Sequence, residues 1–266
     1  MQQVSFLKRI FLNIYFWPVF LLITLVGMAV LPFILLVNIL FFSRTLASGL
    51  RRSIRFYGWV LVCLVPFGAP VRVEGDDKFL SPVIFVANHN SAIDPYLFGA
   101  IITENAFVTS WPFKIPLYAL LMNLAGYVNA GEGWDKVCTK CKKLLETGSS
   151  VTIWPEGHRS RDGRLGRFKN GAFALAIETG IPIVPVCILG SGTVLPPGKK
   201  FLIPGRVRLI VLDPVDVGDS NQSSEIRIKE LRTRVYSAME QILSEKGHFR
   251  QCQIDPEDRS RKKIWI

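Results

Sequence analysis

Residues 10–42 contain no charged side chain and consist almost entirely of aliphatic and aromatic residues. At about 1.5 Å of rise per residue, a helix of this length exceeds the roughly 30 Å hydrocarbon core of a bilayer. The run is too long for the apolar core of a cleaved secretory signal, and no small-residue cleavage pattern leads into a polar mature start. We therefore expect the segment to be retained in the protein and to meet lipid.

The cationic residues around this segment fall on both sides of it and give no clean orientation by the positive-inside rule. They are Lys8, Arg9, Arg44, Arg51, Arg52 and Arg55. Pro18, Gly27 and Pro32 predict bends, and residues 56–70 form a second, shorter apolar stretch suited to a helix embedded in one leaflet. We expect a two-helix, partly re-entrant membrane anchor in residues 1–70, with one simple span as the alternative.

The composition agrees with a membrane as the partner. Lys and Arg number 32 against 21 Asp and Glu, and 18 Phe and 6 Trp accompany the net charge of +11. That combination suits an anionic membrane surface at least as well as nucleic acid. Because the apolar segment decides for the membrane, we expect no nucleic-acid partner. The five cysteines, an odd number, argue against a secreted disulfide framework.

From residue 71 onward, short apolar runs alternate with amphipathic stretches, which is typical of an α/β domain. The predicted strands cover residues 82–87, 106–110, 127–129, 151–154, 183–189 and 207–212. The predicted helices cover residues 91–102, 115–124, 134–146, 172–179 and 224–244. We expect one α/β domain over residues 71–247 and a charged tail over residues 248–266.

A histidine and an aspartate follow the first strand of this domain. If residues 83–87 form a buried strand, Asn88 and His89 lie at its C-terminal end, where α/β sheets hold their ligands. A helix starting at Ser91 would place Asp94 in its first turn, within reach of the His89 imidazole. A carboxylate there fixes the tautomer of a general base. The alternative is a helix-capping cluster with a satisfied histidine.

A second polar cluster follows the strand predicted over residues 151–154. Glu156, Arg159 and Arg161 stand at its tip, and further cations precede a predicted helix. Those further cations are Arg164, Arg167 and Lys169. Guanidinium groups beside a helix start suit a phosphate-bearing substrate, because they bind phosphate oxygens in a bidentate fork. The alternative is a solvated basic loop on a basic protein.

These motifs, in this order and spacing, resemble the glycerolipid acyltransferase family that includes the 1-acyl-glycerol-3-phosphate acyltransferases (PlsC type). The resemblance covers residues 71–212 in four blocks. The matching residues are Asn88, His89 and Asp94; Trp154, Pro155, Glu156, Gly157, His158, Arg159 and Ser160; Phe168, Lys169 and Gly171; and residues 181–186. It implies a mixed sheet with flanking helices, as in glycerol-3-phosphate acyltransferases, preceded by a two-helix membrane module.

The resemblance also implies a chemistry. His89, oriented by Asp94, would act as the general base that takes the proton of an acceptor hydroxyl while its oxygen attacks a thioester carbonyl. The acceptor would be a lysophospholipid, in the first place 1-acyl-glycerol-3-phosphate, and the donor acyl-CoA or an acyl carrier protein thioester. Neither a cofactor nor a metal is expected. The residues expected to bind substrate are Asn88, Glu156, Gly157, Arg159, Lys169 and Lys114.

Two positions depart from the family pattern. Ala130 stands where the family has an arginine that helps to hold the acceptor phosphate, so a different lyso-lipid acceptor is an alternative. His158 replaces the usual threonine and adds a titratable group beside Glu156. Lys114 is a candidate substitute cation, with a plain surface lysine as the alternative.

Two rival functions use the same residues differently. His89, Asp94, Glu156 and His158 supply imidazole and carboxylate groups, so a bound metal would make the protein a lipid hydrolase. A non-catalytic membrane-binding protein would require the His/Asp pair to be accidental. The acyltransferase hypothesis places the catalytic domain on the cytoplasmic face of the cell inner membrane, where a soluble thioester and a lipid acceptor meet.

Overall fold

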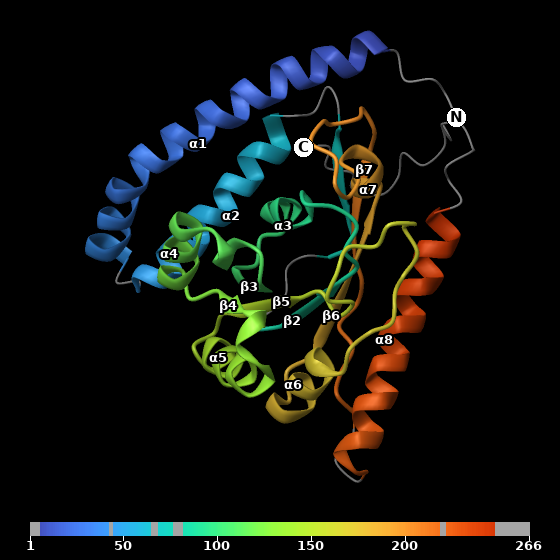
Figure 1. Cartoon of the computed structure of the whole chain (residues 1–266). Helices are drawn as coiled ribbons and strands as arrows, with labels where there is room; N and C mark the ends of the chain where they lie inside the picture. Colours follow the sequence, from blue (N-terminus) through green and yellow to red (C-terminus); the bar gives the residue numbers. More distant parts are fainter. Residues whose placement is uncertain (1–5, 43–44, 65–68, 77–81, 219–221, 248–266) are drawn as a thin grey trace.

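The computed structural model describes residues 6–42, 45–64, 69–76, 82–218 and 222–247 (Figure 1). Within these residues the strands form one seven-stranded sheet of order β1-β7-β6-β2-β5-β3-β4. All neighbouring pairs in it are parallel except β6 and β7. The strands are β1 (Val71–Glu74), β2 (Ile84–Ala87), β3 (Asn105–Thr109), β4 (Val128–Asn129), β5 (Ser150–Ile153), β6 (Ile183–Leu189) and β7 (Val207–Val211).

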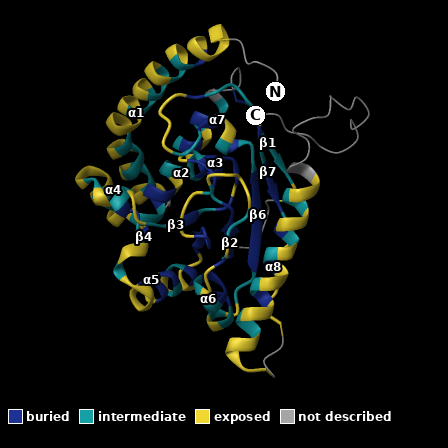
Figure 2. Ribbon diagram, turned by 45° about the vertical axis from the view of Figure 1, so that its right-hand side comes forward, coloured by how far each residue is buried: buried dark blue, intermediate teal, exposed yellow. Residues whose placement is uncertain are grey.

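Helices cover both faces of this sheet (Figures 1 and 2). They are α1 (Phe6–Phe42), α2 (Leu46–Leu64), α3 (Asp94–Leu97), α4 (Pro116–Leu124), α5 (Trp134–Glu146), α6 (Gly171–Thr179), α7 (Ser191–Val194) and α8 (Ser224–Gly247). Short 3-10 turns lie at η1 (Phe98–Ala100), η2 (Pro112–Lys114) and η3 (Ala130–Glu132). Apolar side chains of α1, α2 and α3 pack on one face, and those of α5, α6 and α8 on the other.

Strand β2 lies at the centre of the sheet and is buried on both faces. Because successive side chains of a strand point to opposite faces, Phe85 and Ala87 enter one core while Ile84 and Val86 enter the other. This explains the uninterrupted apolar run in the sequence, which is typical of a central parallel strand. The neighbour β5 is parallel to β2, so both strands end at the same edge of the sheet.

The predicted mixed α/β sheet with flanking helices is confirmed. All six predicted strands form within two residues of their predicted bounds, and α5 has the bounds that its periodicity predicts. The short strand β1 was not predicted. The helix expected over residues 91–102 is reduced to α3 and η1, because residues 91–93 form a turn around the Asp94 carboxylate. The domain boundaries stay predictions, and the tail at residues 248–266 lies outside the described residues.

The predicted two-helix membrane anchor needs correction. Among the described residues one helix, α1, is long and apolar enough to cross a membrane, and it continues through both Pro18 and Pro32. The second helix, α2, starts at Leu46, well before the apolar stretch in which it was expected. Here the backbone N–H of Ser48 bonds to the Thr45 hydroxyl, a helix-start signal that hydropathy does not reveal.

The side chain of Arg51 fixes α2 to the α/β domain. It was expected in a cationic flank of the membrane segment, yet it lies inside the protein with 4% of its surface exposed. Its Nε donates to Glu104 Oε1 at 2.8 Å, and its two other nitrogens donate to the Ala125 carbonyl and the Ser149 hydroxyl, each at 2.8 Å. Glu104 also accepts hydrogen bonds from Ser48 and Arg52. The helix is therefore an integral part of the domain.

A close backbone contact fixes the same helix at a second point. A Cβ atom added at Gly99 would lie 2.2 Å from the backbone nitrogen of Trp59 and 2.5 Å from the carbonyl carbon of Gly58. Only glycine permits η1 and α2 to meet backbone to backbone at this distance. Together with the Arg51 contacts, this packing holds α2 against the turn that follows the His89 and Asp94 segment.

The Arg51–Glu104 ion pair gives a pH-dependent test of this packing. Burial acts to raise the pKa of Glu104. The Arg51 charge and the hydrogen bonds from Ser48, Arg51 and Arg52 together outweigh this effect, so the pKa of Glu104 lies below its usual value. A carboxyl whose pKa is lower in the folded than in the unfolded protein stabilises the folded state at pH values above the unfolded-state pKa, about 4.3. This stabilisation is lost as the pH falls through the pKa of the folded state.

We predict that Glu104→Gln lowers the free energy of unfolding by about 3 kcal/mol at pH 7, because it leaves the buried guanidinium uncompensated. The difference from wild type shrinks as the pH falls below 4. Urea unfolding in detergent at both pH values measures it. The matched control is Glu132→Gln, which removes an exposed pair with Lys140 and costs at most about 1 kcal/mol. Equal destabilisation by both variants would contradict the role given to Glu104.

Candidate active site

His89 and Asp94 form the hydrogen-bonded pair that the sequence predicts. Their Nδ1 and Oδ2 atoms lie 2.8 Å apart. The same Oδ2 accepts the backbone N–H groups of Asn90 and Ser91, at 2.7 and 2.8 Å, so it is an acceptor and His89 Nδ1 must be the donor. The proton on Nδ1 leaves the lone pair on Nε2. His89 lines a cavity, and Nε2 is its one ring nitrogen available to a substrate.

The Asp94 carboxylate is fully buried and organises the turn around it. Its three N–H donors come from three consecutive residues, so the backbone from His89 to Ser91 wraps around one oxygen. The Ser91 hydroxyl donates to the Leu195 carbonyl at 2.7 Å. The structure therefore uses Ser91 to hold this turn in place and leaves its oxygen buried.

Asn88 lies beside the site but faces away from the cavity. Its Nδ2 donates to the Ile188 carbonyl at 2.9 Å, and its Oδ1 accepts the Ile188 backbone N–H at 2.7 Å. These two bonds extend the pairing between β2 and β6 by one residue beyond the end of β2. Both polar atoms of the amide thus have partners within the protein, which fixes the residue next to His89. The substrate contact expected of Asn88 stays a prediction.

Glu156 joins the two strand ends that carry the motifs. One of its carboxylate oxygens accepts the backbone N–H of His89 at 3.1 Å, and the other accepts that of Gly166 at 2.8 Å. Burial raises the pKa of Glu156, while the two backbone N–H groups and the charges of His158 and His89 act to lower it. Its side chain is buried and does not line the cavity, so it shapes the site from below.

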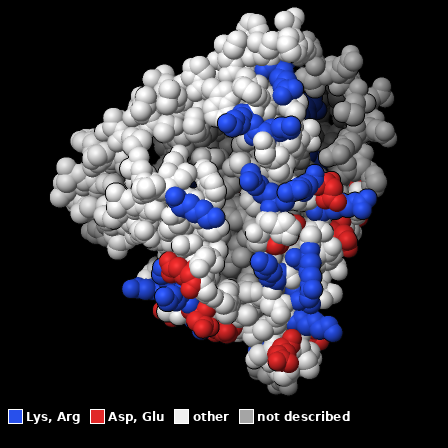
Figure 3. Space-filling model, viewed as in Figure 1, with Lys and Arg blue, Asp and Glu red and all other residues white. Residues whose placement is uncertain are grey.

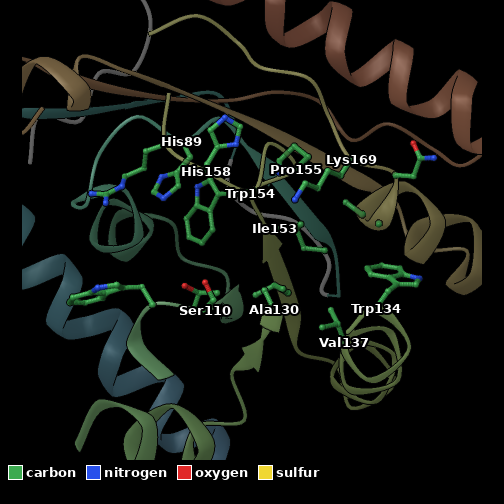
Figure 4. Close-up of a pocket in the computed structure, with 18 of the residues that line it drawn as sticks. His89, Ser110, Ala130, Trp134, Val137, Ile153, Trp154, Pro155, His158 and Lys169 are labelled. Atoms are coloured by element: carbon green, nitrogen blue, oxygen red, sulfur yellow. The ribbon is translucent and has the colours of Figure 1, made fainter. Parts of the chain in front are cut away.

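An open cleft of about 1240 Å³ runs along the site. In Figure 4, His89, His158 and Trp154 gather at one end, Trp134 and Val137 lie at the other, and Ile153 and Ala130 stand between them. The middle and far part of the cleft is thus apolar. The Trp154 ring lies 5.0 Å from the His89 ring, centroid to centroid, with the planes inclined by 32°.

Cations line another part of the same cleft. Arg159, Arg161 and Lys169 all contribute to its lining, and Figure 3 shows the Lys and Arg side chains gathered mostly on one side of the hollow. Gly157 has a φ of +76°, and a Cβ added there would meet Lys169 Nζ at 2.7 Å, so only a glycine lets the lysine lie over this turn. A cleft with one cationic and one apolar wall matches an anionic amphiphile.

The structure places three further residues that the sequence analysis singles out. Lys114 ends η2 with an exposed side chain and is not among the described residues that line the cleft, so its placement agrees with a surface lysine. Ala130 does line the cleft, where it adds an apolar surface. His158 also lines it, with Nδ1 donating to the Glu156 carbonyl at 2.9 Å.

Sequence reasoning did not find the tryptophans of the cleft. Trp111 and Trp134 line it although both are exposed, and Trp154 lies beneath His89. Trp134 lies on the apolar stripe of α5, one turn before the buried Val137 and Cys138, so its spacing alone predicts packing within the domain. No pattern in the sequence distinguishes it as a wall of the cleft.

Comparison with known proteins identifies the relatives of this chain. Residues 70–189 match the family model described as acyltransferase. A chloroplastic 1-acyl-sn-glycerol-3-phosphate acyltransferase of Arabidopsis thaliana is 32% identical over 191 residues, which cover 68% of this chain and 52% of that protein. The protein of the same name from Salmonella typhimurium is 29% identical over 204 residues, 73% of this chain and 81% of that one.

The fold has a solved counterpart. The crystal structure of the 1-acyl-sn-glycerophosphate acyltransferase PlsC from Thermotoga maritima superposes with a TM-score of 0.71 over 93% of this chain and 99% of that chain, at 24% identity. The chain belongs to the acyltransferase family. The relatives it matches are of the PlsC type and are named 1-acyl-sn-glycerol-3-phosphate acyltransferases. It spans about half the length of the plant relatives it matches.

The metal-dependent rival finds no support in the arrangement of the side chains. Within the described residues, no three His, Cys, Asp or Glu side chains converge in a way that could hold a metal ion. Asp94 Oδ2 and both carboxylate oxygens of Glu156 accept hydrogen bonds from within the protein. These three carboxylate oxygens thus already have partners within the protein, while His89 Nε2 faces the cleft.

The charge of Asp94 can be tested with an amide. In Asp94→Asn, the amide oxygen takes the place of Oδ2, because that position accepts two backbone N–H groups, and the negative charge opposite His89 Nδ1–H is lost. We predict a fall in kcat of about 10²–10⁴-fold with little change in KM, because an imidazole without its carboxylate partner is a weaker base. Steady-state kinetics in detergent measure the effect. Asp162→Asn, which changes an exposed aspartate of the neighbouring loop, is the control. Retention of kcat in Asp94→Asn would refute the role of Asp94.

Proposed function

We propose that the protein is an O-acyltransferase that moves a fatty acyl chain from an acyl thioester to the free hydroxyl of 1-acyl-glycerol-3-phosphate, giving phosphatidic acid. The observation that carries the proposal is the His89–Asp94 pair at the edge of a cleft with one cationic and one apolar wall. The names of the relatives support the choice of lysophosphatidic acid as the acceptor.

His89 supplies the base that this reaction needs. An alcohol is a weak nucleophile at neutral pH, so Nε2 removes the hydroxyl proton as the oxygen attacks the carbonyl carbon of the thioester. The C–S bond then breaks, and the leaving thiolate takes the proton from the imidazolium to give a free thiol. Asp94 holds Nδ1–H through both steps. The hydroxyl attacks directly, so no acyl-enzyme forms on the buried Ser91.

The two walls of the cleft divide the acceptor between them. Arg159, Arg161 and Lys169 face the phosphate, because guanidinium and ammonium groups bind phosphate oxygens through charge-assisted hydrogen bonds. The apolar stretch around Ile153 and Val137 accepts hydrocarbon. The donor, an acyl-CoA or an acyl carrier protein thioester, places its thioester carbonyl next to His89. No cofactor takes part in this mechanism.

Helix α1 attaches the protein to the membrane by lying along it. One side of the helix is hydrogen-bonded to the rest of the protein at two positions. Asn13 bonds to the backbone of Leu202, and the Thr24 hydroxyl lies 2.7 Å from the Tyr57 hydroxyl. Farther along, Leu35 packs over Gly49 of α2. The opposite side exposes large apolar residues along the whole helix. A helix that keeps one flank on the domain enters a single leaflet, here the cytoplasmic one.

Acyl transfer by the purified protein in detergent is the direct test. Labelled acyl-CoA and acyl carrier protein thioesters are offered with a panel of lyso-lipids, and we expect phosphatidic acid from lysophosphatidic acid. His89→Ala should lower the rate by at least about 10²-fold. The imidazole of His158 bonds to a backbone carbonyl and not to a carboxylate, so His158→Ala should keep measurable transfer.

Each other outcome has a defined meaning. Transfer only to a different lyso-lipid would show that Ala130 marks a changed acceptor while the acyltransferase chemistry stands. Release of free fatty acid without transfer would replace the proposal by a hydrolase. Full activity of His89→Ala would show that His89 is not the general base.

A further inference from the structure

Asn13 is a polar residue two turns into the apolar helix α1, and a loop on the domain explains its presence. Its Nδ2 donates to the Leu202 carbonyl at 2.9 Å, and its Oδ1 accepts the Leu202 backbone N–H at 2.9 Å. The amide oxygen and nitrogen of Asn13 thus bond to the N–H and carbonyl of one residue, as backbone groups do between two β-strands. An apolar residue at this position would leave two backbone groups of Leu202 without these bonds.

The loop held by Asn13 spans residues 196–202 and connects the cleft with α1. At its start, Pro196, Pro197 and Gly198 line the mouth of the cleft. At its end, Leu202 is buried beneath α1. Between them Lys199 and Lys200 are exposed, and Phe201 keeps 57% of its surface exposed. A large aromatic side chain beside two lysines is a costly surface to leave in water.

The start of α1 adds cations at the same place. Asn13 Nδ2 also donates to the Arg9 carbonyl at 2.8 Å, so the backbones of Arg9 and Leu202 both lie within hydrogen-bonding distance of one nitrogen. Lys8 and Arg9 are exposed. No Asp or Glu occurs in residues 1–20 or 190–206 of the sequence. Four cations and Phe201 therefore share one region without an acidic residue from either segment.

We propose that the 196–202 loop is a second membrane contact, which binds the anionic headgroups of the bilayer and holds the mouth of the cleft at the lipid surface. The inference rests on the membrane attachment proposed for α1. A helix with its side chains is about 10 Å across, and an interfacial helix buries its apolar face about 5–10 Å below the headgroups. A loop bonded to the inner side of that helix lies at headgroup depth, where lysines meet lipid phosphates and Phe201 enters the interface.

Lipid is the occupant that the surroundings favour over an acidic protein. The loop is continuous with the exposed apolar side of α1 through the Asn13 bonds, and exposed Phe6 and Phe11 flank Lys8 and Arg9. Such an alternation of aromatic and cationic side chains fits the boundary between headgroups and acyl chains. A lipid acceptor would then move from the leaflet to His89 without crossing bulk water. An acyl carrier protein, which would use the charges alone, is an outcome of the test below.

The first experiment reads the depth of the loop directly. Phe201→Cys is labelled with a polarity-sensitive fluorophore in a background carrying Cys63→Ser and Cys252→Ser; Cys138, Cys141 and Cys187 are buried. The control carries the label at Lys136→Cys, an exposed position on α5, which packs on the other face of the sheet. With vesicles of phosphatidylglycerol and phosphatidylcholine, we expect a blue shift and quenching by brominated lipid at 201 and neither at 136.

The outcomes separate this inference from the proposed function. Protein that floats with vesicles but shows no response at 201 overturns the loop contact and leaves α1 in place. Protein that does not float overturns both membrane contacts, while acyl transfer in detergent is decided independently. A response at 201 to acyl carrier protein and not to vesicles overturns the lipid contact and makes the loop a protein-binding site.

The second experiment tests the charges. Lys199→Ala combined with Lys200→Ala removes two lysines that do not line the cleft. If the loop binds anionic headgroups, phosphatidylglycerol in vesicles should stimulate acyl transfer. Because each lysine near an anionic surface is worth about fivefold in binding, we expect this stimulation to fall by about 5–30-fold in the double variant. The rate in neutral detergent micelles should stay unchanged. The control pair, Lys136→Ala with Lys143→Ala on α5, removes the same charge and should keep the stimulation. An equal loss in both pairs, or in neither, overturns the inference.

Discussion

The hydrogen bond from the His89 backbone to the Glu156 carboxylate is the interaction on which the site depends. It joins the loops that follow β2 and β5, and these strands are parallel neighbours at the centre of the sheet. Parallel pairing brings the two strand ends to one edge, and the carboxylate then fixes the loops relative to each other. His89 and the cationic wall stand in register through this buried group and through the Ser160 backbone N–H, which donates to the His89 carbonyl at 2.7 Å. Residues far apart in the sequence thereby form a single cleft.

Polar side chains inside apolar segments determine how the N-terminal helices attach to the domain. Arg51 satisfies all its contacts inside the protein, and Asn13 and Thr24 each have a partner outside α1. In an apolar environment an unpaired polar group costs several kcal/mol, so each such residue marks a flank that faces protein. The remainder of α1 is exposed and, on the membrane attachment proposed above, faces lipid. Hydropathy measures only the length of such a helix, whereas its few polar residues fix its orientation.

This distinction explains what the sequence could and could not predict. The strands and α5 followed from periodicity, and the pairing of His89 with Asp94 followed from its motif, because both depend on local spacing. The role of Asn88 did not, since its partner Ile188 lies 100 residues further along the chain. The bounds of α2 were also missed, because Arg51 resembles a membrane flank until Glu104 is seen beside it. Long-range polar partners are invisible in a single sequence.

Glu156 shows why such a group is kept although its burial has a cost. Its pKa is raised, so the ionised side chain makes the folded state less stable above the pKa of the unfolded state than a solvated carboxylate would. A glutamine would avoid that cost but has one oxygen, and its NH₂ group would face the N–H of either His89 or Gly166. Only a carboxylate accepts from both loops at once. The site therefore sacrifices some stability for the precise placement of His89, which is where buried polar groups are most useful.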